Sequence, residues 1–95
     1  MNPTTPQIAQ ARATIVNRLG LHARPAMAFV DLASTFHSDI RVRKGAEAVD
    51  GKSIMQMLLL AATQGTRLTV EADGPDAAEA LKALEVLVHN RFNED

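Results

Sequence analysis

Hydrophobic residues along the chain follow two periods, and together they predict four strands and three helices. Segments that alternate apolar with polar residues, or that are rich in β-branched residues, favour strands. These segments are residues 12–17, 39–43, 46–49 and 67–71. Apolar residues that recur every three or four positions predict amphipathic helices. These segments are residues 23–36, 53–63 and 77–88.

The connections between these segments indicate how they pack. Lys44 and Gly45 supply a turn between two neighbouring strands, which predicts a hairpin. Short connections favour an antiparallel sheet, and alternation within the strands indicates that only one sheet face is buried. We therefore expect an α+β fold with the order βαββαβα. It is an open-faced two-layer sandwich, in which three helices cover one face of a four-stranded antiparallel sheet.

The beginning of the chain differs in character from the rest. It is polar and interrupted by Pro3 and Pro6, without the basic and apolar regions of a secretory signal. We expect residues 1–10 to form a flexible leader and residues 11–95 to form one domain. The longest nearly apolar run, residues 54–62, is far shorter than the roughly 20 residues that span a bilayer. These features predict a cytoplasmic protein without membrane insertion.

The start of the first predicted helix is the most informative part of the chain. Pro25 fits a helix only in its first turn, so the helix begins at His22 or Ala23. Histidine is a poor N-cap, and a helix N-terminus favours an anion. A neutral ring nitrogen is a competent nucleophile toward phosphorus, and Arg24 could hold a phosphoryl group. Spacing alone leaves open an ordinary loop histidine beside a solvated arginine.

The second predicted helix begins at Ser53. Ser53 and Gln56 have the spacing of a capping box, so an N-cap is the commoner role for this serine. The alternative is phosphorylation, which the helix dipole would tolerate at this position.

The helix that follows is too apolar for a helix packed on one sheet face. Gln56 is the only strongly polar residue between positions 54 and 62. Because a domain of this size has nothing to cover the outer face, some of these side chains should be exposed. They are Ile54, Met55, Leu58 and Leu59. An exposed apolar patch of this kind favours a partner surface over a pure core role.

Composition excludes several classes of function. The chain has 95 residues, no cysteine, 3% aromatic residues and a net charge of −1. It therefore lacks disulfides, thiolate metal sites, aromatic platforms for single-stranded nucleic acid, and a basic field for nucleic acid or acidic lipid. A metal site would need His37 and His89 together, and nothing in their spacing supports this. We expect no metal, no cofactor and no nucleic-acid partner.

Two separated motifs resemble those of a known family. Residues 20–26 read GLHARPA, and residues 52–55 read KSIM. Over about residues 11–92, in both motifs and in element order, the chain resembles the histidine-containing phosphocarrier proteins (HPr) of the bacterial phosphoenolpyruvate-dependent phosphotransferase system. The resemblance implies a phosphoryl carrier rather than an independent catalyst. The fold of the family is the sandwich predicted above, and we expect a monomer.

The resemblance also implies roles for individual residues. His22 would accept a phosphoryl group on Nδ1 from phosphorylated Enzyme I and pass it to an EIIA-type acceptor. Arg24 would assist, and Ala23 would place a backbone N–H near the phosphate. Ser53 matches the regulatory serine that an ATP-dependent HPr kinase/phosphorylase modifies in many bacteria. The implied partner-binding residues are Met27, Lys52, Ile54, Met55 and Leu58.

One departure from the family pattern bears on the pathway. Many sugar-transport members carry Asn or Ser three positions before the active histidine, where this chain has Leu19. Residues 17–22 and 89–95 look more like the nitrogen-related branch (NPr), which favours a mainly regulatory phospho-signalling module as the alternative. A more remote alternative is an acylphosphatase-like hydrolase that pairs Arg24 with Asn17.

Overall fold

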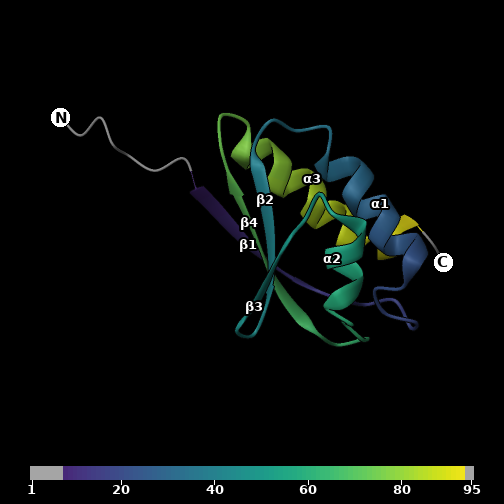
Figure 1. Ribbon diagram of the computed structural model, residues 1–95. Coiled ribbons are helices and arrows are strands. Elements are labelled where there is room, and N and C mark those ends of the chain that lie inside the picture. The colour runs from purple at the N-terminus through teal and green to yellow at the C-terminus, as the bar shows by residue number, and fades with distance from the viewer. Residues whose placement is uncertain (1–7, 94–95) are drawn as a thin grey trace.

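The computed structural model describes residues 8–93, in which a four-stranded antiparallel sheet carries three helices on one face (Figure 1). The strands are β1 (Ile8–Thr14), β2 (Asp39–Lys44), β3 (Glu47–Asp50) and β4 (Arg67–Asp73). The helices are α1 (Ala23–Ala33), α2 (Ile54–Leu59) and α3 (Ala77–His89), followed by a short 3-10 turn, η1 (Arg91–Asn93). The open-faced sandwich and its βαββαβα order are confirmed.

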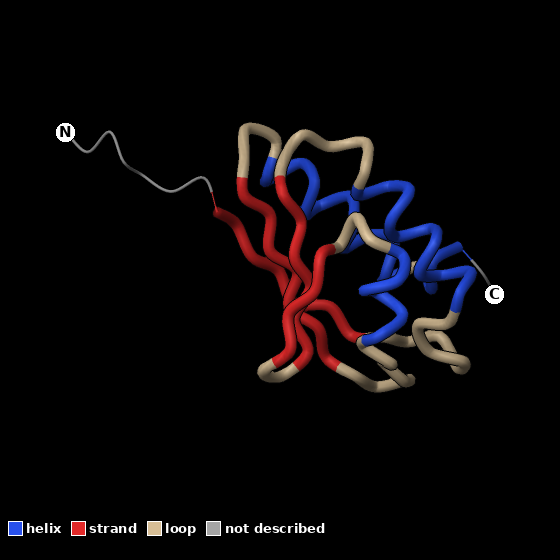
Figure 2. Tube along the Cα trace, in the orientation of Figure 1, coloured by secondary structure: helices blue, strands red, loops and turns tan. Residues whose placement is uncertain are grey.

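The sheet has the order β1-β4-β2-β3, with every neighbouring pair antiparallel (Figure 2). The last strand in the chain is therefore central, paired with β1 on one side and β2 on the other. The predicted hairpin joins β2 to β3, with Lys44 opposite Glu47 at its closed end. This topology leaves one sheet face open, and α1 and α2, whose N-caps are His22 and Ser53, both lie on the covered face (Figure 1).

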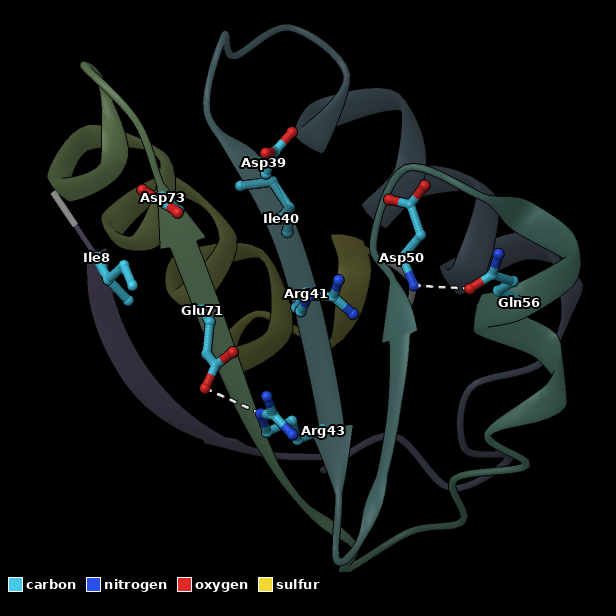
Figure 3. A pocket seen from close by; sticks show the side chains of 9 residues that line it. All are labelled: Ile8, Asp39, Ile40, Arg41, Arg43, Asp50, Gln56, Glu71 and Asp73. Atoms are coloured by element: carbon cyan, nitrogen blue, oxygen red, sulfur yellow. Dashed lines mark hydrogen bonds and ion pairs between the residues drawn. The ribbon is translucent and has the colours of Figure 1, made fainter. Parts of the chain in front are cut away.

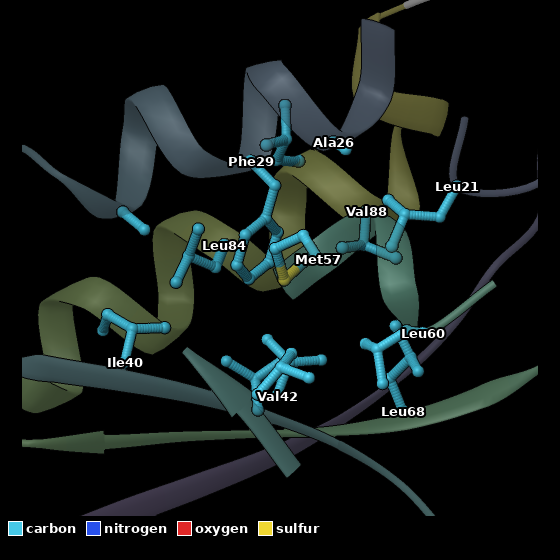
Figure 4. Close-up of a cluster of buried hydrophobic side chains, with 14 of the residues drawn as sticks. Leu21, Ala26, Phe29, Ile40, Val42, Met57, Leu60, Leu68, Leu84 and Val88 are labelled. Carbon is cyan, nitrogen blue, oxygen red and sulfur yellow. The ribbon is translucent and has the colours of Figure 1, made fainter. Parts of the chain in front are cut away.

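The hydrophobic core lies between the sheet and the helices (Figure 4). Alternation along β2 and β4 turns Ile40, Val42 and Val70 toward it, and α1 and α3 contribute Phe29 and Leu84. Each of these side chains is at most 2% exposed, and burial of such a side chain contributes about 1.5–3 kcal/mol. The alternation that predicted the strands is thus the pattern that fills the core.

The first strand begins earlier than predicted. Strand β1 pairs with β4 from Ile8 to Thr14, so residues 8–10 are strand rather than leader, and the strand ends before Asn17. The inward-facing residues of β1 are alanines that pack only partly against the core, such as Ala9 and Ala11. Alanine gives a weak hydrophobic signal, which explains the misplaced boundary. Residues 1–7, the rest of the expected leader, and residues 94–95 lie outside the described residues.

Two helices end earlier than predicted. Helix α1 stops at Ala33 instead of Phe36. Two residues beyond it, backbone N–H groups bond to the carbonyl three residues back and no longer four, as in Phe36 N–H to Ala33 O at 3.2 Å. Helix α2 stops at Leu59 instead of Thr63, because Ala61 takes a left-handed conformation with a φ of 49°. After each helix the chain therefore returns to the sheet, into β2 after α1 and into β4 after α2.

The carboxylate of Asp76, at the start of α3, braces the loop between α1 and β2. It accepts hydrogen bonds from the Ser38 hydroxyl at 2.5 Å and from the backbone N–H groups of His37 and Ser38 at 2.8 and 2.9 Å. These bonds, that of the Ser38 hydroxyl foremost, lower the pKa of Asp76 to about 2. The brace lies at the opposite end of α1 from His22.

Candidate functional site

His22 is the N-cap of α1, as the position of Pro25 predicted. Its backbone is extended, with φ −85° and ψ −171°, and its carbonyl oxygen accepts the Ala26 N–H at 3.0 Å. The imidazole makes no capping hydrogen bond. Pro25, the third helical residue, has no N–H to offer a cap. The backbone N–H groups of Ala23 and Arg24 therefore remain as the polar donors of the first turn.

A shallow hollow surrounds His22 at the start of α1. It is lined by His22, Ala23, Arg24, Met27, Ala28 and Asp31. The structure thus brings together three of the residues predicted to act with the histidine. The helix N-terminus favours an anion here, and the Arg24 guanidinium adds a positive charge. Asp31 was not predicted to be part of this site. The sequence could have indicated it, because Asp31 lies four residues after Met27 and therefore on the same helix face.

The loop before His22 is held by close backbone contacts with the segment that follows α2. Gly20 has a φ of 71°, and a Cβ atom there would lie 2.5 Å from the carbonyl oxygen of Ala62. That same oxygen accepts the Leu21 N–H at 2.8 Å. On the other side, the buried Asn17 amide donates from Nδ2 to the Gly20 carbonyl at 2.6 Å. Glycine is thus required at position 20 for its conformation and for the approach of Ala62.

Ser53 caps α2 as predicted. Its hydroxyl oxygen accepts the Gln56 N–H at 3.2 Å. The second half of the box differs, because the Gln56 side chain accepts from the Asp50 N–H at 2.9 Å and not from that of Ser53. The serine that resembles a regulatory phosphorylation site therefore already contributes to the start of a helix. Its phosphorylation stays a prediction.

The apolar side chains of α2 divide between core and surface. Met55 and Leu59 are 71% and 73% exposed, and Leu58 is also exposed, which confirms the expected apolar surface. Ile54 is half-buried against the core, and Met57 is fully buried. None of these residues lines the hollow at His22.

Two further residues bear on this surface. Leu19, on the loop before His22, exposes 69% of its side chain and was not predicted as part of a contact surface. The sequence could have indicated this exposure, because Leu19 is a large apolar residue in a turn, where polar residues are usual. The other is Lys52, the basic residue predicted beside Ser53 as part of the partner surface. Its ammonium donates to the Phe36 carbonyl at 2.8 Å, which ties the side chain to the segment after α1.

A second hollow lies on the open face of the sheet (Figure 3). It contains the ion pair of Arg43 with Glu71, 2.9 Å apart, and the Arg43 hydrogen bond is the main cause that lowers the pKa of Glu71. Its lining residues are Ile8, Asp39, Ile40, Arg41, Arg43, Asp50, Gln56, Glu71 and Asp73. Neither His22 nor Ser53 belongs to it, so it is separate from the predicted chemistry.

Two structural properties of residues 8–93 bear on metal binding and membrane insertion. No group of three or more histidine, cysteine or carboxylate residues in this range is placed to hold a metal ion. Within the same range, no helix has the length and apolar character needed to cross a membrane.

Comparison with known proteins decides the family. Residues 9–90 match the family described as "PTS HPr component phosphorylation site". The chain belongs to the HPr family of phosphocarrier proteins. This is the family that the motifs at residues 20–26 and 52–55 resemble. Membership in the HPr family supports a role as a carrier in phosphoryl transfer.

Individual members show how far the similarity extends. The chain is 46% identical over 85 residues to the phosphocarrier protein HPr of Cupriavidus necator, which covers 90% of this chain and 96% of that protein. It is 44% identical over 86 residues to the phosphocarrier protein NPr of Proteus mirabilis, covering 88% and 94%. The crystal structure of HPr-C-His from Thermoanaerobacter tengcongensis superposes with a TM-score of 0.88 at 42% identity, covering 92% and 98%. The similarity thus spans the whole sandwich.

The acylphosphatase-like alternative finds no support in the geometry. That alternative needs Asn17 and Arg24 at one site. The Asn17 side chain is buried and braces the loop through Gly20, and it does not line the hollow that contains Arg24.

Proposed function

We propose that His22 accepts a phosphoryl group on Nδ1 from phosphorylated Enzyme I and donates it to EIIA-type acceptors. The observation that carries this proposal is the imidazole at a helix N-terminus, where it makes no capping bond and shares an open hollow with Arg24. A histidine that caps poorly contributes little to the helix, so its place there is explained by chemistry rather than by stability.

The proposed step follows from the groups around His22. The lone pair of Nδ1 attacks phosphorus, a new N–P bond forms, and the bond from phosphorus to the donor breaks with its electron pair leaving on the donor. The phosphoryl oxygens then meet the first-turn N–H groups, including that of Ala23, and the Arg24 guanidinium. The transfer to EIIA is the same displacement in the opposite sense. No resident cofactor takes part.

The open shape of the hollow suits a carrier. Because only one helix lines it, the donor and the acceptor each complete the site when they dock. We propose that docking uses Met27 on α1 and an α2 patch of Ile54, Met55 and Leu58, with Lys52 at its edge. The exposed apolar side chains among them support this surface, since contiguous apolar exposure marks partner sites.

We propose Ser53 as a regulatory phosphorylation site for a kinase of the HPr kinase/phosphorylase type. A phosphate on the Ser53 oxygen could keep accepting the Gln56 N–H, so the cap would survive the modification. The added negative charge would stand at the start of the helix that carries the docking patch. It should therefore oppose the approach of a partner that carries a phosphate of its own.

A regulatory role in the nitrogen-related branch is the second candidate. It is favoured by Leu19, three positions before His22, where an exposed leucine replaces the polar residue of many sugar-transport members. The similarity to the NPr of Proteus mirabilis is compatible with it. The discriminating experiment compares phosphoryl transfer to a sugar-specific EIIA with transfer to a nitrogen-branch EIIA.

The test of the carrier function is phosphorylation by Enzyme I and phosphoenolpyruvate. The wild-type protein should gain the mass of one phosphoryl group, and acid should remove it. The His22→Ala variant should gain none, whereas the matched His37→Ala variant should behave as wild type. An acid-labile adduct on the His22→Ala protein would overturn the assignment.

A further inference from the structure

The turn that ends α2 is attached to the sheet by a lysine. Lys44, the last residue of β2, donates from Nζ to the carbonyl oxygen of Leu60 at 2.7 Å. Leu60 is the C-cap of α2, and its side chain is fully buried. An ammonium at this position stabilises the negative end of the helix dipole and binds a carbonyl that has no partner within the helix.

The residues after Leu60 adopt a conformation that needs such support. Ala61 has a φ of 49°, which is left-handed, and a residue with a Cβ atom pays about 1 kcal/mol or more there. The turn thereby directs the Ala62 carbonyl at the loop before His22, where it accepts the Leu21 N–H at 2.8 Å. A strained turn persists only when its surroundings hold it.

The loop before His22 is in direct contact with this turn, so a displacement of the turn would displace the loop. The approach of Gly20 to Ala62 leaves no room for a Cβ atom, so the two backbone segments are in direct contact. Leu21, which donates to Ala62, is itself buried and immediately precedes His22. The contacts form a short series: Lys44 to Leu60, through the turn to Ala62, and from Ala62 to the backbone beside the histidine.

We infer that Lys44 is a positioning residue for phosphoryl transfer at His22. The inference rests on the proposed function and extends it to a residue outside the hollow, because Lys44 is not among the residues that line it. Lys44 acts through the α2 turn: its ammonium fixes the Leu60 carbonyl, and the fixed turn sets the position of the His22 backbone against the first-turn N–H groups. The position of Nδ1 of His22 therefore depends on the ammonium of Lys44, at the end of β2.

The test compares Lys44→Met, Lys44→Gln and Lys44→Arg in phosphorylation by Enzyme I. Loss of the ammonium should lower kcat on the order of tenfold and leave KM nearly unchanged, because small displacements of reacting groups are costly while the docking patch is intact. The Lys44→Arg variant keeps a charged donor and should recover most of the rate. The Lys44→Gln variant serves if Lys44→Met does not fold.

A second readout does not depend on phosphorylation. Hydrogen exchange of the Leu21 amide should be faster in Lys44→Met and Lys44→Gln than in wild type, since its acceptor turn has lost an anchor. Asp76→Ala is the control for lost stability, because it breaks polar bonds in the loop after α1, at the opposite end of that helix from His22. It should leave Leu21 exchange and kcat at their wild-type values.

The outcomes separate the two proposals. If wild-type kcat and wild-type Leu21 exchange persist in Lys44→Met and Lys44→Gln, the positioning role is wrong. The role is also wrong if Asp76→Ala lowers kcat as much as they do. If the wild-type protein takes no phosphoryl group from Enzyme I, the proposed function fails, while the exchange measurement still decides the link from Lys44 to Leu21.

Discussion

Helices α1 and α2 begin at the two residues proposed to carry phosphate, and they begin in different ways. Ser53 closes the start of α2 with its own hydroxyl, which accepts the Gln56 N–H. His22 caps α1 with its backbone only, and the third helical residue, Pro25, offers no N–H to a side chain. The Ser53 side chain therefore contributes a hydrogen bond to the start of its helix, whereas the His22 imidazole contributes no side-chain cap.

This contrast separates stability from chemistry. A change at Ser53 should be felt first in the free energy of unfolding, and a change at His22 first in phosphoryl transfer. It also separates the effects of phosphate at the two positions. At Ser53 the phosphate would take over an existing bond, whereas at His22 it would meet helix donors that no side-chain cap occupies.

The largest effect is expected for His22→Ala. Phosphoryl transfer from Enzyme I should be lost, because His22 supplies the only imidazole among the described residues that line the hollow. No side-chain capping bond is removed from α1, so the free energy of unfolding should fall by less than it does in Ser53→Ala. Chemical denaturation and Enzyme I assays on the same preparation check both halves. A large loss of stability would mean that His22 supports the helix after all.

The next largest effect is expected for Gly20→Ala, with Gly45→Ala as the matched control. Both glycines are left-handed, with φ of 71° and 59°, so both variants should lose about 1 kcal/mol of stability. Only Gly20 faces a close neighbour, the Ala62 carbonyl, so Gly20→Ala should lose roughly 1 to 3 kcal/mol more. It should also slow phosphorylation of His22, which Gly45→Ala should not.

Denaturation curves and Enzyme I assays on the two glycine variants test this expectation. Equal losses in both would show that the contact of the His22 loop with the α2 turn is unimportant for stability.

A smaller effect is expected for Ser53→Ala. Removal of the capping oxygen should cost about 1 kcal/mol of unfolding free energy, while phosphorylation of His22 by Enzyme I stays near the wild-type rate. Ser34→Ala, at the exposed C-cap of α1, is the control and should change neither quantity. Loss of His22 phosphorylation in Ser53→Ala would abolish the separation between the two helix starts.

The smallest effect concerns pH and the far end of α1. The folded state holds the pKa of Asp76 at about 2, below its ordinary value of 3.8, so the ionised form is favoured by folding. The stability that this carboxylate adds is present above about pH 4 and is lost as the pH falls toward 2. Asp76→Asn should therefore reduce the acid-dependent decrease in stability between these values. Thermal unfolding at several pH values measures it, and an unchanged acid dependence would contradict the role of the brace.

The two helix starts could be predicted from sequence because local rules decide them. Proline is confined to a first turn, which placed the start of α1, and the Ser53-Gln56 spacing placed the start of α2. The exposed part of α2 was also predictable, because a helix with apolar residues on both faces cannot bury all of them on one sheet. In each case the signal lies within a few neighbouring residues.

The support of the site could not be predicted in the same way. Ala62 and Lys44 carry no local signal for their contacts with Leu21 and Leu60, which lie far away in the sequence or on another element. Only the folded chain brings these backbone groups together. Strand β1 was misplaced for a different reason: alanines such as Ala11 face the core, and their small side chains weaken the alternation.

The proposed carrier of the phosphoryl group is one nitrogen of one histidine, Nδ1 of His22. It is tested most directly by nitrogen and phosphorus NMR of the protein labelled with ¹⁵N at histidine, after reaction with Enzyme I and phosphoenolpyruvate. A phosphorus-coupled signal is expected from Nδ1 of His22, with the rings of His37 and His89 unchanged. A phosphoryl group on Nε2, on either of those two histidines or on Ser53 would contradict it.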